Sequence, residues 1–287
     1  MRHASRVTKW VAGGKQISLD RPIVVAVLNV TPDSFSDGGA YLTLENAIRR
    51  ADEAVGEGAD AVDVGGESTR PGAARISEAD ELERVLPVIR DVRRRHPHVP
   101  LSIDTTRSVV ARAALGAGAD IVNDVSGLRL DPALAEVVAQ TGAGLVLMHS
   151  RGSVEEMASY QHAVYGRDVA GEIVTEITES IDRALGAGIA RDAVVIDPGI
   201  GFSKRAEHSL AVLRDLERLT SLGFPVMVGA SRKRVIGEVT GAVTPTERKD
   251  GTLGAHVAAL AKGARLFRVH DVRAHRHALD VAWRILG

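Results

Sequence analysis

Polar side chains follow eight short apolar segments of the sequence, each at the point where the apolar run ends. The first is Asn29, which closes the run of residues 23–28. The polar residues at the later run ends are Asp63, Asp104, Asn123 with Asp124, His149 after Met148, Asp197, Ser231 with Arg232 and Lys233, and Arg268 with His270. A single Asp or Asn at such a place serves as a structural cap as often as in chemistry. Polar residues at the ends of eight successive apolar runs indicate a functional site.

These residues divide by charge into two groups with different chemistry. The cationic group comprises Arg70, Lys233 and Arg268, with His270 and a metal ion on the Asn29 oxygen as further candidates. Such groups can hold an anion with planar, bidentate geometry. The second group comprises Asp104, Asn123 and Asp197. It offers acceptors and one donor amide to a polar heterocycle. No phosphate-binding motif of the Walker type and no zinc-spaced histidine cluster occurs.

Composition excludes several classes of protein. The chain has 287 residues, of which 45% are apolar and 25% are charged, which is typical of a globular protein. Its net charge of −1 gives no indication of a nucleic-acid or membrane partner. The absence of cysteine excludes disulfides, thiolate nucleophiles and thiolate metal sites. Residues 1–20 lack the apolar segment of a signal peptide, and we therefore expect a cytoplasmic protein.

The elements that must position these residues alternate along the chain. Apolar runs predict strands at 23–28, 61–64, 100–103, 120–123, 144–148, 193–197, 225–229 and 265–269. Helical patterns lie between them at 43–57, 78–95, 107–117, 131–141, 168–187, 206–221, 250–263 and 274–286. Eight such units in residues 21–287 favour a single (β/α)₈ TIM barrel, whose active site lies at the carboxyl ends of the strands. A doubly wound sheet is the alternative, but no G-x-G-x-x-G motif follows the first strand. Residues 1–20 form an N-terminal extension, with a probable hairpin turning at Gly13-Gly14.

Several of these segments together resemble the dihydropteroate synthases, a family of pterin-binding barrels. The first two family signatures match residues 29–39 (NVTPDSFSDGG) and 65–72 (GGESTRPG). Further family segments match in order at 103–105, 122–125, 196–202, 229–233 and 268–272. The resemblance extends from about residue 20 to the C-terminus.

The resemblance implies a transferase reaction in folate biosynthesis. A (7,8-dihydropterin-6-yl)methyl diphosphate would be condensed with 4-aminobenzoate to give 7,8-dihydropteroate and pyrophosphate. In the family the C–O bond breaks first, and the arylamine attacks a pterin-methylene cation. Preorganised charges of both signs suit a departing polyanion beside a nascent cation. Mg²⁺ is the implied cofactor, bound through Asn29. Sulfonamides imitate 4-aminobenzoate, which makes the protein an expected sulfonamide target.

By the same resemblance, each site residue receives a role. The residues expected to bind the pterin diphosphate are Thr69, Asp104, Asn123, Met148, Asp197, Phe202, Lys233, Arg268 and His270. Those expected to bind 4-aminobenzoate are Phe35, Thr69, Arg70, Pro71, Ser231 and Lys233. The catalytic set is Asp37, Asp104, Lys233 and Arg268, with Asp37 facing the cation once the mobile loops at about 30–42 and 66–77 close. Asp63 is expected to be a scaffold residue, and no function is assigned to the segment 149–167.

Three other functions remain open at this point. A Schiff-base aldolase would use Lys233 as its nucleophile. A related barrel would pass a methyl group from a pterin to a corrinoid protein. A non-catalytic pterin-binding paralogue would bind the pterin without turnover. Family members commonly pair through helices late in the barrel, and we therefore expect a homodimer.

Overall fold

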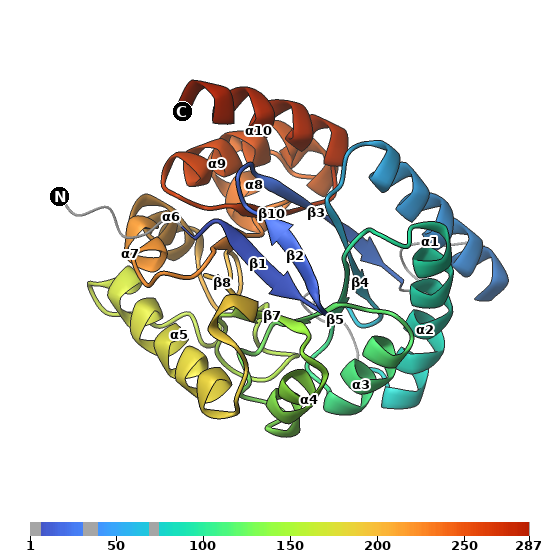
Figure 1. Cartoon of the computed structure of the whole chain (residues 1–287). Helices are drawn as coiled ribbons and strands as arrows, with labels where there is room; N and C mark the ends of the chain where they lie inside the picture. The colour runs from blue at the N-terminus through green and yellow to red at the C-terminus, as the bar shows by residue number, and fades with distance from the viewer. Residues whose placement is uncertain (1–6, 31–39, 69–74, 287) are drawn as a thin grey trace.

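The computed structural model describes residues 7–30, 40–68 and 75–286, and it has the architecture of a TIM barrel (Figure 1). Eight parallel strands are ordered β8-β7-β6-β5-β4-β3-β10-β9, and a parallel bridge between Ile196 and Val226 joins the two ends of this order. The helices form a ring around the strands. The predicted barrel is confirmed.

The bounds of the elements agree with the sequence prediction to within a few residues in most places. The barrel strands are β3 (Ile23–Asn29), β4 (Ala61–Gly65), β5 (Leu101–Asp104), β6 (Ile121–Asp124), β7 (Gly144–Met148), β8 (Val194–Asp197), β9 (Met227–Val228) and β10 (Leu266–Val269). The helices are α1 (Ala40–Gly56), α2 (Glu78–Arg95), α3 (Ser108–Gly116), α4 (Ala133–Thr141), α5 (Val169–Gly186), α6 (Ala206–Arg214), α7 (Glu217–Thr220), α8 (Arg234–Thr240), α9 (Lys249–Ala261) and α10 (Val272–Leu286). Two short 3₁₀ helices are η2 (Arg191–Ala193) and η3 (Pro245–Arg248).

Two differences from the prediction concern the last third of the chain. The single helix predicted for residues 206–221 is divided into α6 and α7, because Asp215 leaves helical geometry with ψ of 26°. The unpredicted helix α8 follows β9. It begins after Lys233 in an extended conformation and ends at Gly241, whose φ of +77° is the left-handed geometry of a helix terminus.

The predicted N-terminal hairpin is present and closes one end of the barrel. Strands β1 (Lys9–Ala12) and β2 (Lys15–Ser18) pair in antiparallel register, with the turn at Gly13-Gly14. Figure 1 shows this hairpin lying across the middle of the ring of strands. Trp10 is buried there, and its indole N–H donates to the carbonyl of Ala193 at 2.8 Å. The hairpin packs on apolar side chains inside the barrel and covers the barrel interior at that end.

The Gly-Ala-Asp segments that precede two strands explain how the helices return to the sheet. Gly58 and Gly118 have φ of +96° and +116°, a range that L side chains rarely adopt. The aspartate that follows each glycine binds the preceding strand: Asp60 accepts from the Val24 amide and Asp120 from the Leu101 amide. Among the described residues, no helix combines the length and the apolar character needed to cross a membrane.

Candidate active site

The alternation of side chains along the strands positions the site. In β3, Ile23 and Val25 point into the barrel and pack in the interior cluster beneath the hairpin, whereas Val24 and Ala26 pack outward against the helices. Two residues further along the same inward row lie Val27 and Asn29, which line the cavity at the other end. In four other strands the inward row also changes from apolar to polar: Ala61 is followed by Asp63, Ile121 by Asn123, Val195 by Asp197 and Leu266 by Arg268. A polar layer therefore lies at the carboxyl ends of the strands.

Strand register brings this polar layer together from distant parts of the sequence. Asn29 is in register with Gly65, Gly65 with Asp104, and Asp104 with Asn123. Because neighbouring strands lie about 4.8 Å apart, residues in register are direct neighbours around the barrel. The polar residues of β3, β5 and β6 thus share one level of the barrel.

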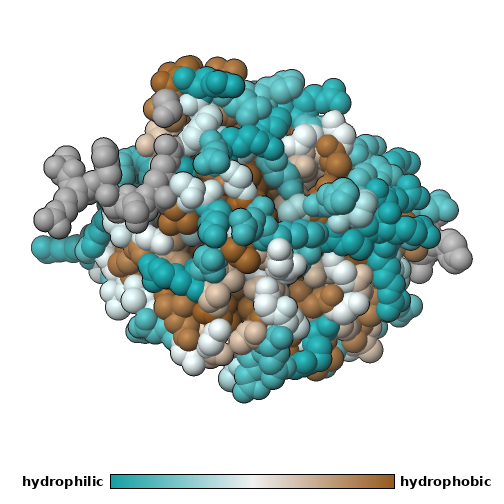
Figure 2. All heavy atoms as spheres, viewed as in Figure 1, coloured by the Kyte–Doolittle hydropathy of each residue, from teal (hydrophilic) through white to brown (hydrophobic). Residues whose placement is uncertain are grey.

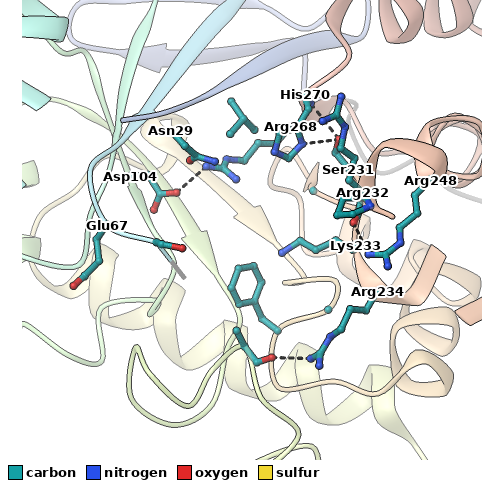
Figure 3. Close-up of a pocket in the computed structure, with 17 residues that line it drawn as sticks. Asn29, Glu67, Asp104, Ser231, Arg232, Lys233, Arg234, Arg248, Arg268 and His270 are labelled. Atoms are coloured by element: carbon teal, nitrogen blue, oxygen red, sulfur yellow. Dashed lines mark hydrogen bonds and ion pairs between the residues drawn. The ribbon is translucent and has the colours of Figure 1, made fainter. Parts of the chain in front are cut away.

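A cavity of about 300 Å³ opens above this layer (Figure 3). The predicted site residues that line it are Asn29, Asp104, Phe202, Ser231, Lys233, Arg268 and His270. The other charged residues in its wall are Glu67, Arg232, Arg234 and Arg248. Cationic side chains outnumber carboxylates in this lining, and the cavity is therefore suited to a polyanion.

The floor of the cavity is a hydrogen-bonded network around Arg268. Its Nε donates to Asp63 Oδ2 at 2.6 Å, and its Nη2 donates to Asp104 Oδ2 at 2.7 Å. Asp63 Oδ2 also accepts from Asn123 Nδ2 at 3.0 Å. The second oxygen of Asp63, Oδ1, is buried and has no partner among the described residues. A buried carboxylate oxygen without a partner is costly, and it offers an acceptor to a ligand.

Ser231 and His270 form a second contact at the cavity wall. The backbone N–H of His270 donates to Ser231 Oγ at 3.1 Å, and the hydroxyl lies 2.9 Å from His270 Nδ1. Burial and the neighbouring Arg268 lower the pKa of His270 to about 3, so its ring is neutral near pH 7. If the hydroxyl donates to Nδ1, the ring proton lies on Nε2. In that tautomer His270 can donate a hydrogen bond to an anion.

Burial shifts the pKa values of the ionisable groups in the floor and wall. It raises the pKa of Asp104 to about 7, against the opposing effect of Arg268, and that of Asp197 to about 6. It lowers the pKa of Lys233 to about 7, a shift that Arg268 increases. The pKa of Arg268 is raised: burial lowers it, but Asp63 and Asp104 outweigh that effect. Groups of opposite charge that titrate near neutrality are typical of active sites.

Lys233 lies over the aromatic wall of the cavity. Its Nζ is 3.6 Å from the centre of the Phe202 ring, which is the geometry of a cation–π contact. Figure 3 shows the Lys233 side chain extending from the α8 side of the cavity toward its middle. The amine can therefore reach a ligand held between the carboxylate floor and the Phe202 ring.

The remaining predicted residues lie elsewhere. Asn123, Met148 and Asp197 are buried and are not among the residues that line the cavity. Met148 packs with Phe202 in one apolar cluster. Asp37, Phe35, Thr69, Arg70 and Pro71 fall outside the described residues.

Sequence reasoning missed two residues that line the cavity, Glu67 and Arg248. Asp63 was expected to be a scaffold residue that hydrogen-bonds neighbouring loops, and it accepts hydrogen bonds from the side chains of Arg268 and Asn123. Glu67 lines the cavity and accepts from Arg107 Nη2 at 3.2 Å. Arg248 lines it from η3, and no sequence pattern pointed to that residue.

Comparisons with known proteins show the family of this chain. The family described as pterin binding enzyme matches residues 25–270. A dihydropteroate synthase of Mycobacterium leprae is 47% identical over 272 residues, covering 92% of this chain and 94% of the relative. A Mycobacterium tuberculosis protein named inactive dihydropteroate synthase 2 is 41% identical over 277 residues, covering 96% of this chain and 86% of its own. The structure of Xanthomonas albilineans dihydropteroate synthase with 4-aminobenzoic acid superposes with a TM-score of 0.90 at 43% identity, covering 97% of this chain and 98% of that one.

The chain combines a TIM barrel, a cationic cavity and a polar floor with more than 40% sequence identity to the relatives named above. Neither an aldolase nor a methyl-transferring barrel accounts for that combination. The chain belongs to the pterin binding enzyme family and, within it, to the dihydropteroate synthases.

Proposed function

We propose that this protein condenses (7,8-dihydropterin-6-yl)methyl diphosphate with 4-aminobenzoate, giving 7,8-dihydropteroate and pyrophosphate. The observation that carries the proposal is the cavity itself, in which Lys233 and Arg268 stand between a carboxylate floor and a cationic wall. The carboxylates of the floor can accept hydrogen bonds from a heterocycle rich in N–H groups, and the cations of the wall can bind a diphosphate. Membership of the dihydropteroate synthases supports both assignments.

The chain's own residues divide the work of this reaction. We assign the pterin to the acceptors of the floor, Asp104, Asn123 and Asp197, with the free Oδ1 of Asp63 as a fourth acceptor. Arg268 and the Nε2–H of His270 are placed to hold the diphosphate and to stabilise the negative charge that develops as it leaves. The Phe202 ring gives an apolar surface that keeps water from the pterin cation.

The 4-aminobenzoate site is assigned to the upper part of the same cavity. Ser231 and Lys233 contribute from the β9 end, and Phe35, Thr69, Arg70 and Pro71 complete the proposed set. Lys233 belongs to both substrate sites in this assignment. Asp37 remains the proposed group that faces the pterin cation.

Mg²⁺ is the proposed cofactor, and Asn29 is the residue that would hold it. Mg²⁺ prefers oxygen ligands and keeps several waters, so one protein oxygen beside substrate phosphates is sufficient. The described residues fit this arrangement: Asn29 lines the cavity, and they contain no cluster of three or more acidic or metal-binding side chains that would bind the ion alone. When bound, the ion would supply charge neutralisation to the diphosphate.

The test of the proposed function is product formation by the purified protein. Pyrophosphate and dihydropteroate should appear in equal amounts when the pterin diphosphate, Mg²⁺ and 4-aminobenzoate are all present, and neither should accumulate to that level without 4-aminobenzoate. The alternative is a non-catalytic pterin-binding paralogue, for which a relative named inactive is the support, and it is less supported than the synthase. Tight binding of the pterin diphosphate without any product would establish that alternative.

We also propose that two copies pair through the end of the chain. Three apolar side chains of α10 are exposed, Val281 at 61%, Ile285 at 78% and Leu286 at 50%. Figure 2 shows hydrophobic residues gathered at the C-terminal end of this helix. Light scattering should give twice the chain mass of 30.4 kDa, and Ile285→Lys should give one chain mass. An unchanged dimer in that variant would place the interface elsewhere.

The cytoplasmic location and the sulfonamide sensitivity stay predictions.

A further inference from the structure

Lys204 is a buried lysine whose ammonium group is surrounded by backbone carbonyls. Its relative exposure is 1%, which is rare for lysine. Its Nζ lies 2.8 Å from His149 Nδ1, 3.0 Å from the Phe202 carbonyl oxygen and 3.1 Å from the Gly199 carbonyl oxygen. The carbonyl oxygen of His149 lies at 3.4 Å. Within the described part of the chain, no carboxylate lies at ion-pair distance from it, so these neutral acceptors replace its water shell, and burial lowers the pKa of Lys204 to about 7.

The loop between β8 and α6 is wound around this ammonium group. Gly199, Gly201 and Ser203 all have positive φ, at 66°, 76° and 48°. A Cβ added at Gly199 would lie 2.0 Å from the His149 carbonyl oxygen, so the two chain segments approach as closely as the backbone allows. Glycine adopts these φ values readily, so Ser203 is the strained residue of the three. The hydrogen bonds from Lys204 to the Gly199 and Phe202 carbonyls hold the loop in this conformation.

The same loop carries Phe202, which forms the aromatic wall of the active-site cavity. The carbonyl of Phe202 accepts from Lys204, and its ring lies against the Lys233 amine at 3.6 Å. The next residue, Ser203, accepts from the Arg151 amide at 2.9 Å and donates to the Arg151 carbonyl at 2.8 Å. The segment 149–167, to which no function was assigned from the sequence, is thus hydrogen-bonded through Arg151 to the residue that follows Phe202.

A chain of contacts fixes His149 in turn. Since His149 Nδ1 accepts from Lys204, its proton resides on Nε2, which lies 3.0 Å from Glu176 Oε2 on α5. Burial and the neighbouring Lys204 together lower the pKa of His149 to about 4, which is consistent with a neutral ring that accepts from an ammonium group. Glu176 also pairs with Arg151. Glu176 of α5, outside the strands of the barrel, therefore fixes the His149 ring that contacts Lys204.

We propose that Lys204 is a positioning residue of the active site: its ammonium group folds the β8–α6 loop so that Phe202 packs against Lys233. Lys204 contacts neither the cavity nor Lys233, and it acts through the backbone of Phe202. The role in catalysis rests on the proposed function, whereas the effect on the Phe202 ring does not depend on any reaction.

The ring position is tested first, by fluorine NMR. The chain has four phenylalanines, so protein labelled with 4-fluorophenylalanine gives a simple spectrum, and Phe202→Leu identifies the Phe202 signal. Lys204→Met should shift or broaden the Phe202 signal and leave those of Phe224 and Phe267 unchanged. The matched control is Lys262→Met, at an exposed lysine paired with Glu217 near the closed end of the barrel, which should change none of these signals. An unmoved Phe202 signal in the Lys204→Met protein would overturn the proposal.

Kinetics then measure the consequence for the site. For Lys204→Met we expect kcat/KM for the pterin diphosphate to fall roughly 10- to 100-fold, the loss typical of a site displaced by about 1 Å. Lys262→Met should keep the wild-type value. If the wild type itself has no turnover, the proposed function fails while the NMR result still decides the role of Lys204. A shifted signal with unchanged kcat/KM would reduce Lys204 to a structural residue.

Two further variants keep the proposal testable if Lys204→Met does not fold. His149→Asn retains an acceptor close to the place of Nδ1, whereas His149→Leu removes it. The leucine variant should move the Phe202 signal more than the asparagine variant does. The absence of cysteine also allows chemical rescue: alkylating Lys204→Cys with 2-bromoethylamine in denaturant rebuilds an ammonium group of lysine length. Refolded protein with this group should regain the native Phe202 signal, and alkylation with bromoethane, which adds no charge, should not.

Discussion

Asp63→Asn separates a role in binding from a role in the scaffold, because it changes the charge of the cavity floor without changing its shape. Asp63 is 1% exposed, and its Oδ2 accepts from Arg268 Nε at 2.6 Å and Asn123 Nδ2 at 3.0 Å. An asparagine oxygen at the same place can accept both hydrogen bonds. The bond from Arg268 loses its charge assistance, and the unpaired Oδ1 is replaced by an unpaired N–H₂ group.

The two consequences have different expected sizes. A hydrogen bond to a charged group contributes about 1.5–3 kcal/mol and a neutral one about 0.5–1.5 kcal/mol. We therefore expect the free energy of unfolding to fall by about 1–2 kcal/mol, which lowers Tm by a few degrees for a chain of this size. If Oδ1 accepts a hydrogen bond from an N–H of the pterin, the substitution places the asparagine N–H₂ group against that N–H, and two donors then face each other. That adds about 1–3 kcal/mol to the binding free energy, or roughly 10- to 100-fold in Kd.

The assay compares this variant with Asp60→Asn. Asp60 lies at the opposite end of the barrel, where it also accepts from a backbone amide, that of Val24 at 2.8 Å, and from an arginine, Arg276 at 2.9 Å. Calorimetry should give similar losses of Tm for the two variants. Titration with the pterin diphosphate should show weaker binding for Asp63→Asn alone. Wild-type affinity in Asp63→Asn would refute the reasoning and return Asp63 to the scaffold role expected from the sequence.

Three other predictions concern the same site. Lys233→Met should lower kcat by roughly 100-fold or more, since it removes a cation shared by both substrate sites; steady-state rates near the wild-type value would exclude Lys233 from catalysis. Asp197 has a pKa of about 6, and its carboxylate is the form that accepts an N–H of the pterin. Affinity for the pterin should therefore be full above pH 6 and fall about tenfold per pH unit below it, with a flatter profile in Asp197→Asn titrated by calorimetry. Asn29→Ala should raise the Mg²⁺ concentration needed for half-maximal rate, and an unchanged metal titration would contradict the assignment of the ion to Asn29.

Most of the barrel followed from local patterns. A buried parallel strand requires a continuous apolar run, and several helices here return to the sheet through a glycine with positive φ, so runs such as 23–28 and glycines such as Gly58 carry the information locally. The division of helix 206–221 and the presence of α8 did not follow, because both depend on what the segment packs against. The prediction was weakest where the chain is shaped by tertiary contacts.

The sequence by itself also determined which residues stand at the strand ends, since a polar residue after an apolar run needs no partner to be recognised. Only the tertiary structure decided what each of them does. Asp63 accepts from Asn123, which lies two strands away, and from Arg268, which is 205 residues away in the sequence, and only the closed barrel brings these three side chains together. Lys204 followed a glycine-rich loop and carried no signal of its own. Its role arises because closing the barrel removes the ammonium group from water, and a buried charge then fixes every acceptor that surrounds it.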